Sequence, residues 1–190
     1  MKILETIRDS DLGFDSPAPA SYEERMAARA IVFDREGTIA LLNATKKNYH
    51  KLPGGGVEQG ESIEDALRRE LVEEIGCAIE NIRGLGAIEE FRNEFALHQI
   101  SHCFFAHLSG EKGIPNLQAG EEIEDGFETV WLNLDKAIAT LEYEADIQRY
   151  EGKFIRLRDL TFLQEAANAS ITHKVKPCDK PCDITPANRV

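Results

Sequence analysis

The sequence predicts an α/β protein in which a mixed β-sheet lies between helices, as an α/β/α sandwich. Strand-like and helix-like segments follow one another along the chain, a glycine-rich turn leads directly into an amphipathic helix, and 42% of the 190 residues are hydrophobic. A chain of this length supports one buried core. We therefore expect a single domain over residues 1–170, with residues 1–25 as an edge element and linker. Residues 171–190 hold three prolines and are predicted to be a disordered tail.

The predicted strands are apolar runs rich in β-branched and aromatic residues. Residues 26–34 and 38–43 are separated by Arg35-Glu36-Gly37, which is typical of a hairpin. Residues 48–52 then form a short strand that leads into the glycine turn. Two acids, Glu89-Glu90, and the polar run 92–94 indicate a turn between two later strands. The remaining predicted elements are strands over residues 3–7, 78–95, 97–108 and 128–134, the last with Trp131 in the core, and helices over residues 135–141 and 146–167, the second with a break at Gly152.

Residues 52–77, LPGGGVEQGESIEDALRRELVEEIGC, are the centre of the predicted structure. The three glycines after Pro53 let the backbone approach another group closely because they carry no Cβ atom. Ser62 is a good N-cap and Asp65 follows it at the spacing of a capping box, so a helix is predicted to begin directly after Ser62. Gly76 is the natural end of this helix.

Three carboxylates share one face of this helix. At about 100° per residue, Glu73 and Glu74 fall with Glu70 in a sector about 100° wide. An apolar ridge beside them predicts that the carboxylates lie at the rim of a packed layer, over the glycine turn. Clustered carboxylates repel one another unless a cation is present, and hard oxygen ligands suit Mg²⁺, with Mn²⁺ as an alternative. The simpler interpretation of such a pattern by itself is a solvated helix face. The ridge consists of Ile63, Leu67, Leu71 and Ile75.

The charged and glycine positions follow a longer spacing. Gly55 is followed after five residues by Glu61, and after seven more by Arg69-Glu70-Leu71, which precede Glu73-Glu74 and Gly76. Over residues 55–77 this pattern resembles the Nudix box of the Nudix hydrolases at every charged and glycine position. Cys77 is the departure, because the family usually has an aliphatic residue there, and a buried free cysteine behaves as a small hydrophobe.

This resemblance implies a Nudix-type α/β/α sandwich that hydrolyses a nucleoside diphosphate linked to another moiety, with water attacking a phosphorus. It implies metal ligation by Glu70, Glu73, Glu74 and the Gly54 carbonyl, and makes Glu70, Glu73 and Arg69 candidate catalytic residues. Arg69 lies one turn before Glu73, so it can pair with that side chain and leave the other carboxylates free for metal.

The expected substrate contacts lie on the glycine turn and on nearby lysines. Gly55 offers a bare backbone, and Lys51 and Lys47 are among the few positive charges close to the turn. Phosphate contact is the functional interpretation of these lysines, and a solvated surface is the alternative. Glu61 is expected to act through a water molecule or to orient another ligand.

A general base is also needed to activate the water. The first candidates are Glu122 and Glu124 in the acidic segment 120–126, followed by Glu121. If that segment is not catalytic, the base is expected inside the box, at Glu70 or Glu73.

Composition excludes some partners. A formal net charge of −12 argues against a nucleic-acid polymer, because such binding relies on Lys and Arg contacts to phosphate. No apolar run is long enough to span a membrane, and the four cysteines show no disulfide framework. We expect a cytoplasmic protein that acts on a small nucleotide or nucleotide derivative, with a homodimer left open.

Two other functions remain compatible with the sequence. One is a catalytically silent sensor of a nucleotide metabolite on the same fold, against which the intact carboxylates of the box argue. The other is an acidic interaction domain, which does not explain the glycine turn. ADP-ribose hydrolases of the family tend to carry a proline some sixteen residues past the box, and this chain has Arg92, Asn93 and Glu94 in that neighbourhood. Nucleoside triphosphates, oxidised nucleotides and nucleotide sugars therefore stay open as substrates.

Overall fold

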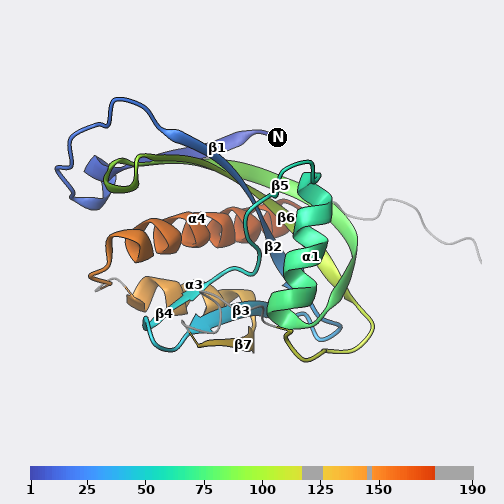
Figure 1. Cartoon of the computed structure of the whole chain (residues 1–190). Coiled ribbons are helices and arrows are strands. Elements are labelled where there is room, and N and C mark those ends of the chain that lie inside the picture. Colours follow the sequence, from blue (N-terminus) through green and yellow to red (C-terminus); the bar gives the residue numbers. More distant parts are fainter. Residues whose placement is uncertain (117–125, 145–146, 174–190) are drawn as a thin grey trace, which may run out of the picture.

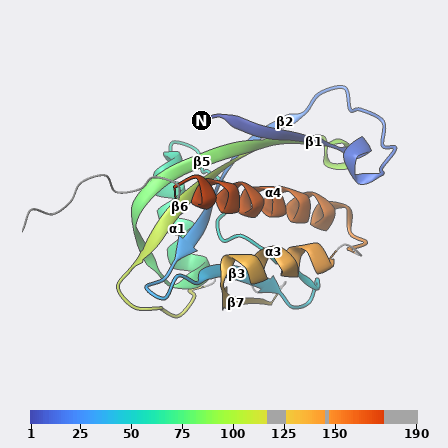
Figure 2. The same cartoon turned by 180° about the vertical axis from the view of Figure 1, so that it is seen from behind.

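The computed structural model describes residues 1–116, 126–144 and 147–173. Its centre is a mixed seven-stranded sheet in the order β1-β5-β6-β2-β3-β4, and β7 pairs with β3 outside this path (Figure 1). Helix α1 packs on one face of the sheet, and helices α3 and α4 cover the other (Figure 2). The predicted α/β/α sandwich is confirmed. The strands are β1 Ile3–Arg8, β2 Glu23–Phe33, β3 Ile39–Ala44, β4 Tyr49–Lys51, β5 Ala78–Arg92, β6 Leu97–Ser109 and β7 Phe127–Leu132; the helices are α1 Ile63–Ile75, α3 Leu134–Tyr143 and α4 Tyr150–His173.

Strand β2 lies inside the sheet and has two buried faces. It pairs in parallel with β6 along its whole length and joins β3 as a hairpin through Phe33 and Ile39. Because side chains alternate along a strand, Ala28 and Ala30 face α1, whereas Ile31 belongs to the core cluster under α4. Arg29 therefore points to the α4 side.

Helix α1 forms as its sequence predicts. The Ser62 side chain accepts a hydrogen bond from the Asp65 N–H at 3.1 Å, and Gly76 ends the helix in the left-handed conformation at φ 66°. The predicted apolar ridge packs against β2, β5 and β6, with Leu67 and Leu71 fully buried.

Two sequence-based assignments are wrong. Glu89 and Glu90 belong to β5, and the turn is formed by a short 3₁₀ helix, Asn93–Phe95, and by Ala96 in the left-handed conformation. Gly152 does not break α4. It lies in the first turn of that helix, where a Cβ atom would come within 2.7 Å of the Ile147 side chain, so packing explains the glycine.

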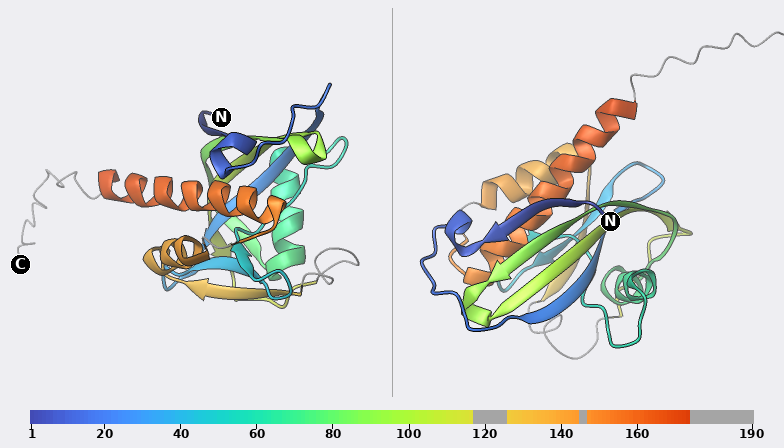
Figure 3. Two further views of the ribbon diagram at one scale, coloured as in Figure 1. Left: turned by 90° about the vertical axis from the view of Figure 1, so that its left-hand side faces the viewer. Right: turned by 90° about the horizontal axis from the view of Figure 1, so that it is seen from above.

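Helix α4 crosses the sheet, and its last turns extend past the sheet (Figure 3). Because α4 ends at His173, the first three residues of the predicted tail are helical. Residues 174–190 lie outside the described part of the chain. None of the helices that the structure describes has the length and apolar character to cross a membrane.

Asp34 holds the turn between β2 and β3 together. Its carboxylate accepts from the N–H groups of Glu36 and Thr38 at 3.0 and 2.8 Å, and Lys112 Nζ lies 2.7 Å away. Burial raises the pKa of Asp34, but the bonds from Lys112 and Thr38 outweigh it and bring the value to about 2, below the usual 3.8.

We predict that Asp34→Asn lowers the free energy of unfolding by about 1–3 kcal/mol at pH 6. Because folding lowers the pKa of Asp34, the stability that its carboxylate contributes is fully present above the unfolded pKa of 3.8. This stability is lost as the pH falls towards 2. Urea unfolding at a series of pH values measures the difference. The exposed Glu111→Gln is the control and should change stability by about 0.5 kcal/mol or less. A wild-type advantage over Asp34→Asn that stays constant from pH 6 to pH 2 would contradict this account.

Candidate functional site

The glycine turn lies directly on β2. The Gly55 carbonyl accepts from the Ala28 N–H at 2.9 Å, and the Pro53 carbonyl accepts from the Ala30 N–H at 3.1 Å. A Cβ atom at Gly54 would come within 2.1 Å of the Ala28 carbonyl oxygen, and Gly54 also has a φ of +125°. Only glycine fits at this position.

Two carboxylates of α1 lie against the other side of the turn. Glu70 and Glu74 are 8% and 2% exposed. Glu74 accepts from the Gly54 N–H and from Lys51 Nζ, the latter at 3.0 Å. The Glu70 carboxylate occupies the space that a Cβ atom at Gly55 would need, with 2.2 Å between them. The expected position of these carboxylates over the glycine turn is confirmed.

Arg69 has more partners than its spacing to Glu73 suggests. It bonds Glu61 through two nitrogens at 3.0 Å each, Glu70 at 2.9 Å and Glu73 at 3.3 Å. It also donates to the Gly56 carbonyl at 3.0 Å. The bond to Glu61 raises the pKa of Arg69 and, in return, lowers the pKa of Glu61. Arg69 therefore joins the turn to the helix, and Glu61 holds Arg69.

The carboxylates are suited to a cation. Burial, and after it the charge of Glu74, raise the pKa of Glu70, while Arg69 acts in the opposite direction. This repulsion between two desolvated carboxylates is what a hard divalent ion relieves. In the described part of the chain no three Asp, Glu, His or Cys side chains surround one point. Lys51 holds Glu74, and Arg69 holds Glu70 and Glu73.

The other predicted site residues have different positions. Gly54 uses its N–H for Glu74, and the structure shows no hydrogen bond to its carbonyl from the described residues. Lys47 lines a separate cavity of about 600 Å³ with Tyr143, Glu144 and Arg149 among others, none of them from the box. Glu121, Glu122 and Glu124 lie outside the described residues.

Sequence reasoning missed two arginines of β2. Arg25 lies over the turn, since its guanidinium would be 3.0 Å from a Cβ atom at Gly56, and Arg29 is buried beside Gly54. Burial and the neighbouring Arg158 lower the pKa of Arg29 to about 10, so it is still charged at pH 7. The available signal for Arg29 was a charged residue inside the apolar run MAARAIVF, and Arg25 directly precedes that run.

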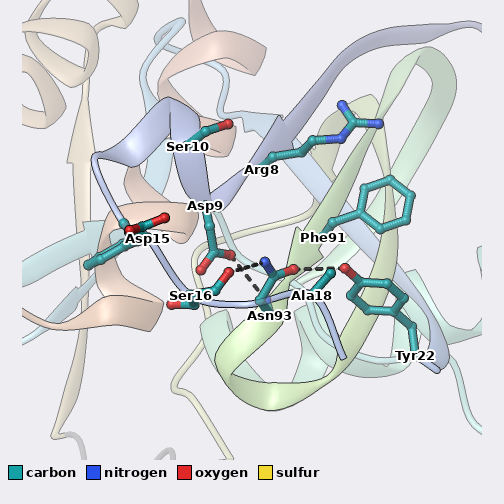
Figure 4. Close-up of a pocket in the computed structure, with 10 residues that line it drawn as sticks. Arg8, Asp9, Ser10, Asp15, Ser16, Ala18, Tyr22, Phe91 and Asn93 are labelled. Atoms are coloured by element: carbon teal, nitrogen blue, oxygen red, sulfur yellow. Dashed lines mark hydrogen bonds between the residues drawn. The ribbon is translucent and has the colours of Figure 1, made fainter. Parts of the chain in front are cut away.

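A second cavity, of about 420 Å³, lies where β1 ends (Figure 4). Phe91 forms one wall, with Tyr22 edge-on at 5.4 Å and the Arg8 guanidinium 5.0 Å above the ring. Asn93 crosses the cavity, accepting from the Tyr22 hydroxyl at 2.7 Å and donating to the Ser16 carbonyl at 2.8 Å. No residue of the box lines it.

A NUDIX domain model matches residues 23–155, which is more than half of the chain. The chain therefore belongs to the NUDIX domain family, and the resemblance of residues 55–77 to the Nudix box is confirmed.

Individual relatives agree with this membership. The chain is 34% identical over 124 residues to the "Oxidized purine nucleoside triphosphate hydrolase" of Danio rerio, covering 64% of this chain and 74% of that one. It is 49% identical over 45 residues to the "RNA pyrophosphohydrolase" of a Sulfurovum species, covering 24% of this chain and only 27% of that protein. A solved NUDIX hydrolase from Nitrosomonas europaea shares the fold, with a TM-score of 0.59, 15% identity, and coverage of 77% of this chain and 90% of that one.

We predict that Gly54→Ala destabilises the protein far more than Gly60→Ala. Both glycines have positive φ, but a Cβ atom at Gly60 meets nothing within 4 Å, whereas one at Gly54 meets the backbone of β2. Gly60→Ala should cost about 1 kcal/mol from backbone strain, and Gly54→Ala several times as much. Denaturant unfolding of the two variants measures the difference. Equal losses would show that the turn is not pressed against β2.

Proposed function

We propose that the protein is a metal-dependent pyrophosphohydrolase that cleaves a nucleoside diphosphate linked to another moiety, with water attacking a phosphorus. The observation that carries this proposal is the burial of Glu70 and Glu74 against a glycine turn that tolerates no side chain. Membership of the NUDIX domain family and the hydrolase names of the relatives support the same reaction.

Glu70, Glu73, Glu74 and the Gly54 carbonyl would hold the cation, for which Mg²⁺ is expected and Mn²⁺ is the alternative. When bound, the ion neutralises the diphosphate, polarises its P–O bonds and lowers the pKa of a bound water.

Basic side chains of the chain itself would orient the diphosphate. Lys51 is held between Glu74, at 3.0 Å, and the Phe127 ring, whose centroid is 4.3 Å from Nζ. This places one ammonium group beside the carboxylate that would bind the ion, where it can also meet a phosphate oxygen. Arg69, held by Glu61, fixes Glu70 and Glu73 relative to the turn. Gly55 was expected to contact the substrate, but the space on its bare side is taken by the Glu70 carboxylate. Lys47 is the more remote candidate contact.

The substrate is proposed to be a small nucleotide or nucleotide derivative. The match to the Danio rerio protein extends over most of that protein, whereas the match to the RNA pyrophosphohydrolase covers about a quarter of it. The net charge of −12 also favours a small metal-bridged anion over a polymer. Oxidised and ordinary purine nucleoside triphosphates are therefore the first compounds to test, followed by nucleotide sugars.

We also propose that the protein acts in a reducing compartment such as the cytoplasm. Cys77 and Cys103 are buried free thiols in the described structure, and they pack as small apolar residues.

We predict that wild-type protein with Mg²⁺ releases phosphate-terminated products from at least one compound of a nucleotide panel, with product masses showing cleavage at a diphosphate. Glu74→Gln should lower kcat by about 10²-fold or more because it removes a metal ligand. Without metal it should melt within a few degrees of wild type, because the Gln oxygen can still accept from the Gly54 N–H and the repulsion with Glu70 is removed.

Glu64→Gln is the matched control, since Glu64 lies on the same helix but pairs with Arg68 at the surface. Undiminished turnover by Glu74→Gln would contradict the metal assignment. Nucleotide binding without turnover by wild type would instead indicate the silent sensor.

The general base stays a prediction, with Glu122 and Glu124 first and Glu121 behind them. Replacing the true base with Gln should lower kcat by about 10²- to 10⁴-fold and leave KM within several-fold of wild type. Rate profiles from pH 6 to pH 9 for the three single variants provide the measurement. If all three variants keep wild-type kcat, the base lies in the box, with Glu70 or Glu73 as the candidates.

A further inference from the structure

A buried charged cluster lies on the opposite side of the glycine turn from α1, between the sheet and α4. We call it the arginine cluster; it consists of Arg29 from β2, Glu90 and Arg92 from β5, and Arg158 and Asp159 from α4. All five residues are at most 7% exposed. Buried charges are costly unless they are paired and hydrogen-bonded, so each of them requires a physical reason.

The other four members of the arginine cluster pair with one another, although Arg92 Nε and Arg158 Nη2 are also buried without a hydrogen-bond partner. Glu90 accepts from Arg92 at 2.8 Å and contacts Arg158 at 3.5 Å, and Arg158 donates to Asp159 at 2.7 Å. Glu90 also accepts from the side chain of Gln99 at 2.9 Å. Two carboxylates thus balance two guanidinium groups.

Arg29 is the third guanidinium and has no carboxylate of its own. Its Nε and Nη1 are buried and have no hydrogen-bond partner. Glu70 and Glu74 attract its charge across the turn, but their oxygens are held by Arg69 and Lys51. A buried donor without a partner is costly, and more so when it is charged, so Arg29 calls for an acceptor that the described residues do not supply.

One hydrogen bond attaches the arginine cluster to the glycine turn, and the backbone of Arg29 adjoins the turn. Asp159 accepts a hydrogen bond from the Leu52 N–H at 2.8 Å, directly before the turn. The Arg29 Cα would be 3.0 Å from a Cβ atom at Gly54. The Arg29 backbone therefore adjoins the residue whose N–H holds Glu74, and the charges of Glu74 and Glu70 act on the Arg29 guanidinium.

We propose that Arg29 is a substrate-binding residue whose free N–H groups receive a pair of hydrogen-bond acceptors on the substrate, beside the diphosphate that is cleaved. This inference rests on the proposed function and deepens it, because it requires a substrate with two adjacent acceptors at that place. A planar guanidinium binds such pairs bidentately.

Two parts of a nucleotide offer this chemistry. One is a pair of non-bridging phosphate oxygens, and the other is the O6 and N7 edge of guanine or of a related purine that keeps the O6 carbonyl. Adenine presents an amino donor in place of the O6 acceptor. A comparison of GDP with ADP therefore distinguishes binding of the purine edge from binding of the phosphate oxygens.

The test uses the full-length protein in EDTA, so that binding is measured without turnover. Calorimetry with pyrophosphate, GDP and ADP compares wild type with Arg29→Met and Arg29→Lys. We expect Arg29→Met to weaken binding at least tenfold, and Arg29→Lys to restore part of it. Loss of affinity for all three ligands assigns the phosphate to Arg29, whereas a selective loss for GDP assigns the purine edge.

Melting temperatures of the variants distinguish a substrate-binding role of Arg29 from a purely structural role. Arg29→Met should melt at or above the wild-type temperature, because it removes a buried charge without a partner. Arg92→Met should melt several degrees lower, because it removes a guanidinium that Glu90 uses. Exposed Arg83→Met, at the Phe105 ring, controls for the loss of a positive charge and should leave affinity unchanged.

Three results would overturn the proposal. The first is that Arg29→Met binds all three ligands as tightly as wild type. The second is that Arg29→Met loses as much melting temperature as Arg92→Met but no affinity. The third is that wild type binds none of the three ligands. The binding experiment in EDTA can succeed where the hydrolysis panel fails, and the reverse also holds, so failure of this inference is distinguishable from failure of the proposed function.

Discussion

The contact between the glycine turn and β2 is the constraint on which the site depends. Hydrogen bonds from Ala28 and Ala30 hold the turn so closely that a side chain at Gly54 would collide with the strand backbone. The N–H group of Gly54 then holds Glu74 on the opposite side. β2, the glycine turn and α1 thus lie against one another in that order. One peptide chain, the turn itself, separates the Glu74 carboxylate from β2.

Local spacing predicted the parts of the structure that depend on residues close together in sequence. The Ser62 cap, the Gly76 stop and the ridge containing Leu67 and Leu71 formed as expected, because helix capping and periodicity are properties of a few neighbouring residues. The placement of Glu70 and Glu74 over the turn followed from the same geometry.

Partners that come from distant segments could not be predicted in this way. The acidic pair Glu89-Glu90 is predicted to mark a turn, yet Arg158, which lies 68 residues after Glu90, contacts Glu90 inside the protein. The spacing predicts that Arg69 pairs with Glu73, but the turn also brings Glu61 and the Gly56 carbonyl within hydrogen-bond distance of the same guanidinium. Local spacing indicates which charges share a face, and only tertiary packing decides which of them meet.

The hydrogen bond between Leu52 and Asp159 joins groups separated by 107 residues. During synthesis the strands, the turn and α1 leave the ribosome well before α4 does. Until α4 docks, the Leu52 N–H has no protein acceptor and the apolar side chains on that face of the sheet, such as Ile31 and Ile88, are uncovered. A nascent chain therefore carries the complete Nudix box before the site is fully packed. Helix α4, which is synthesised last, then supplies the partner of Leu52 and covers that face of the sheet.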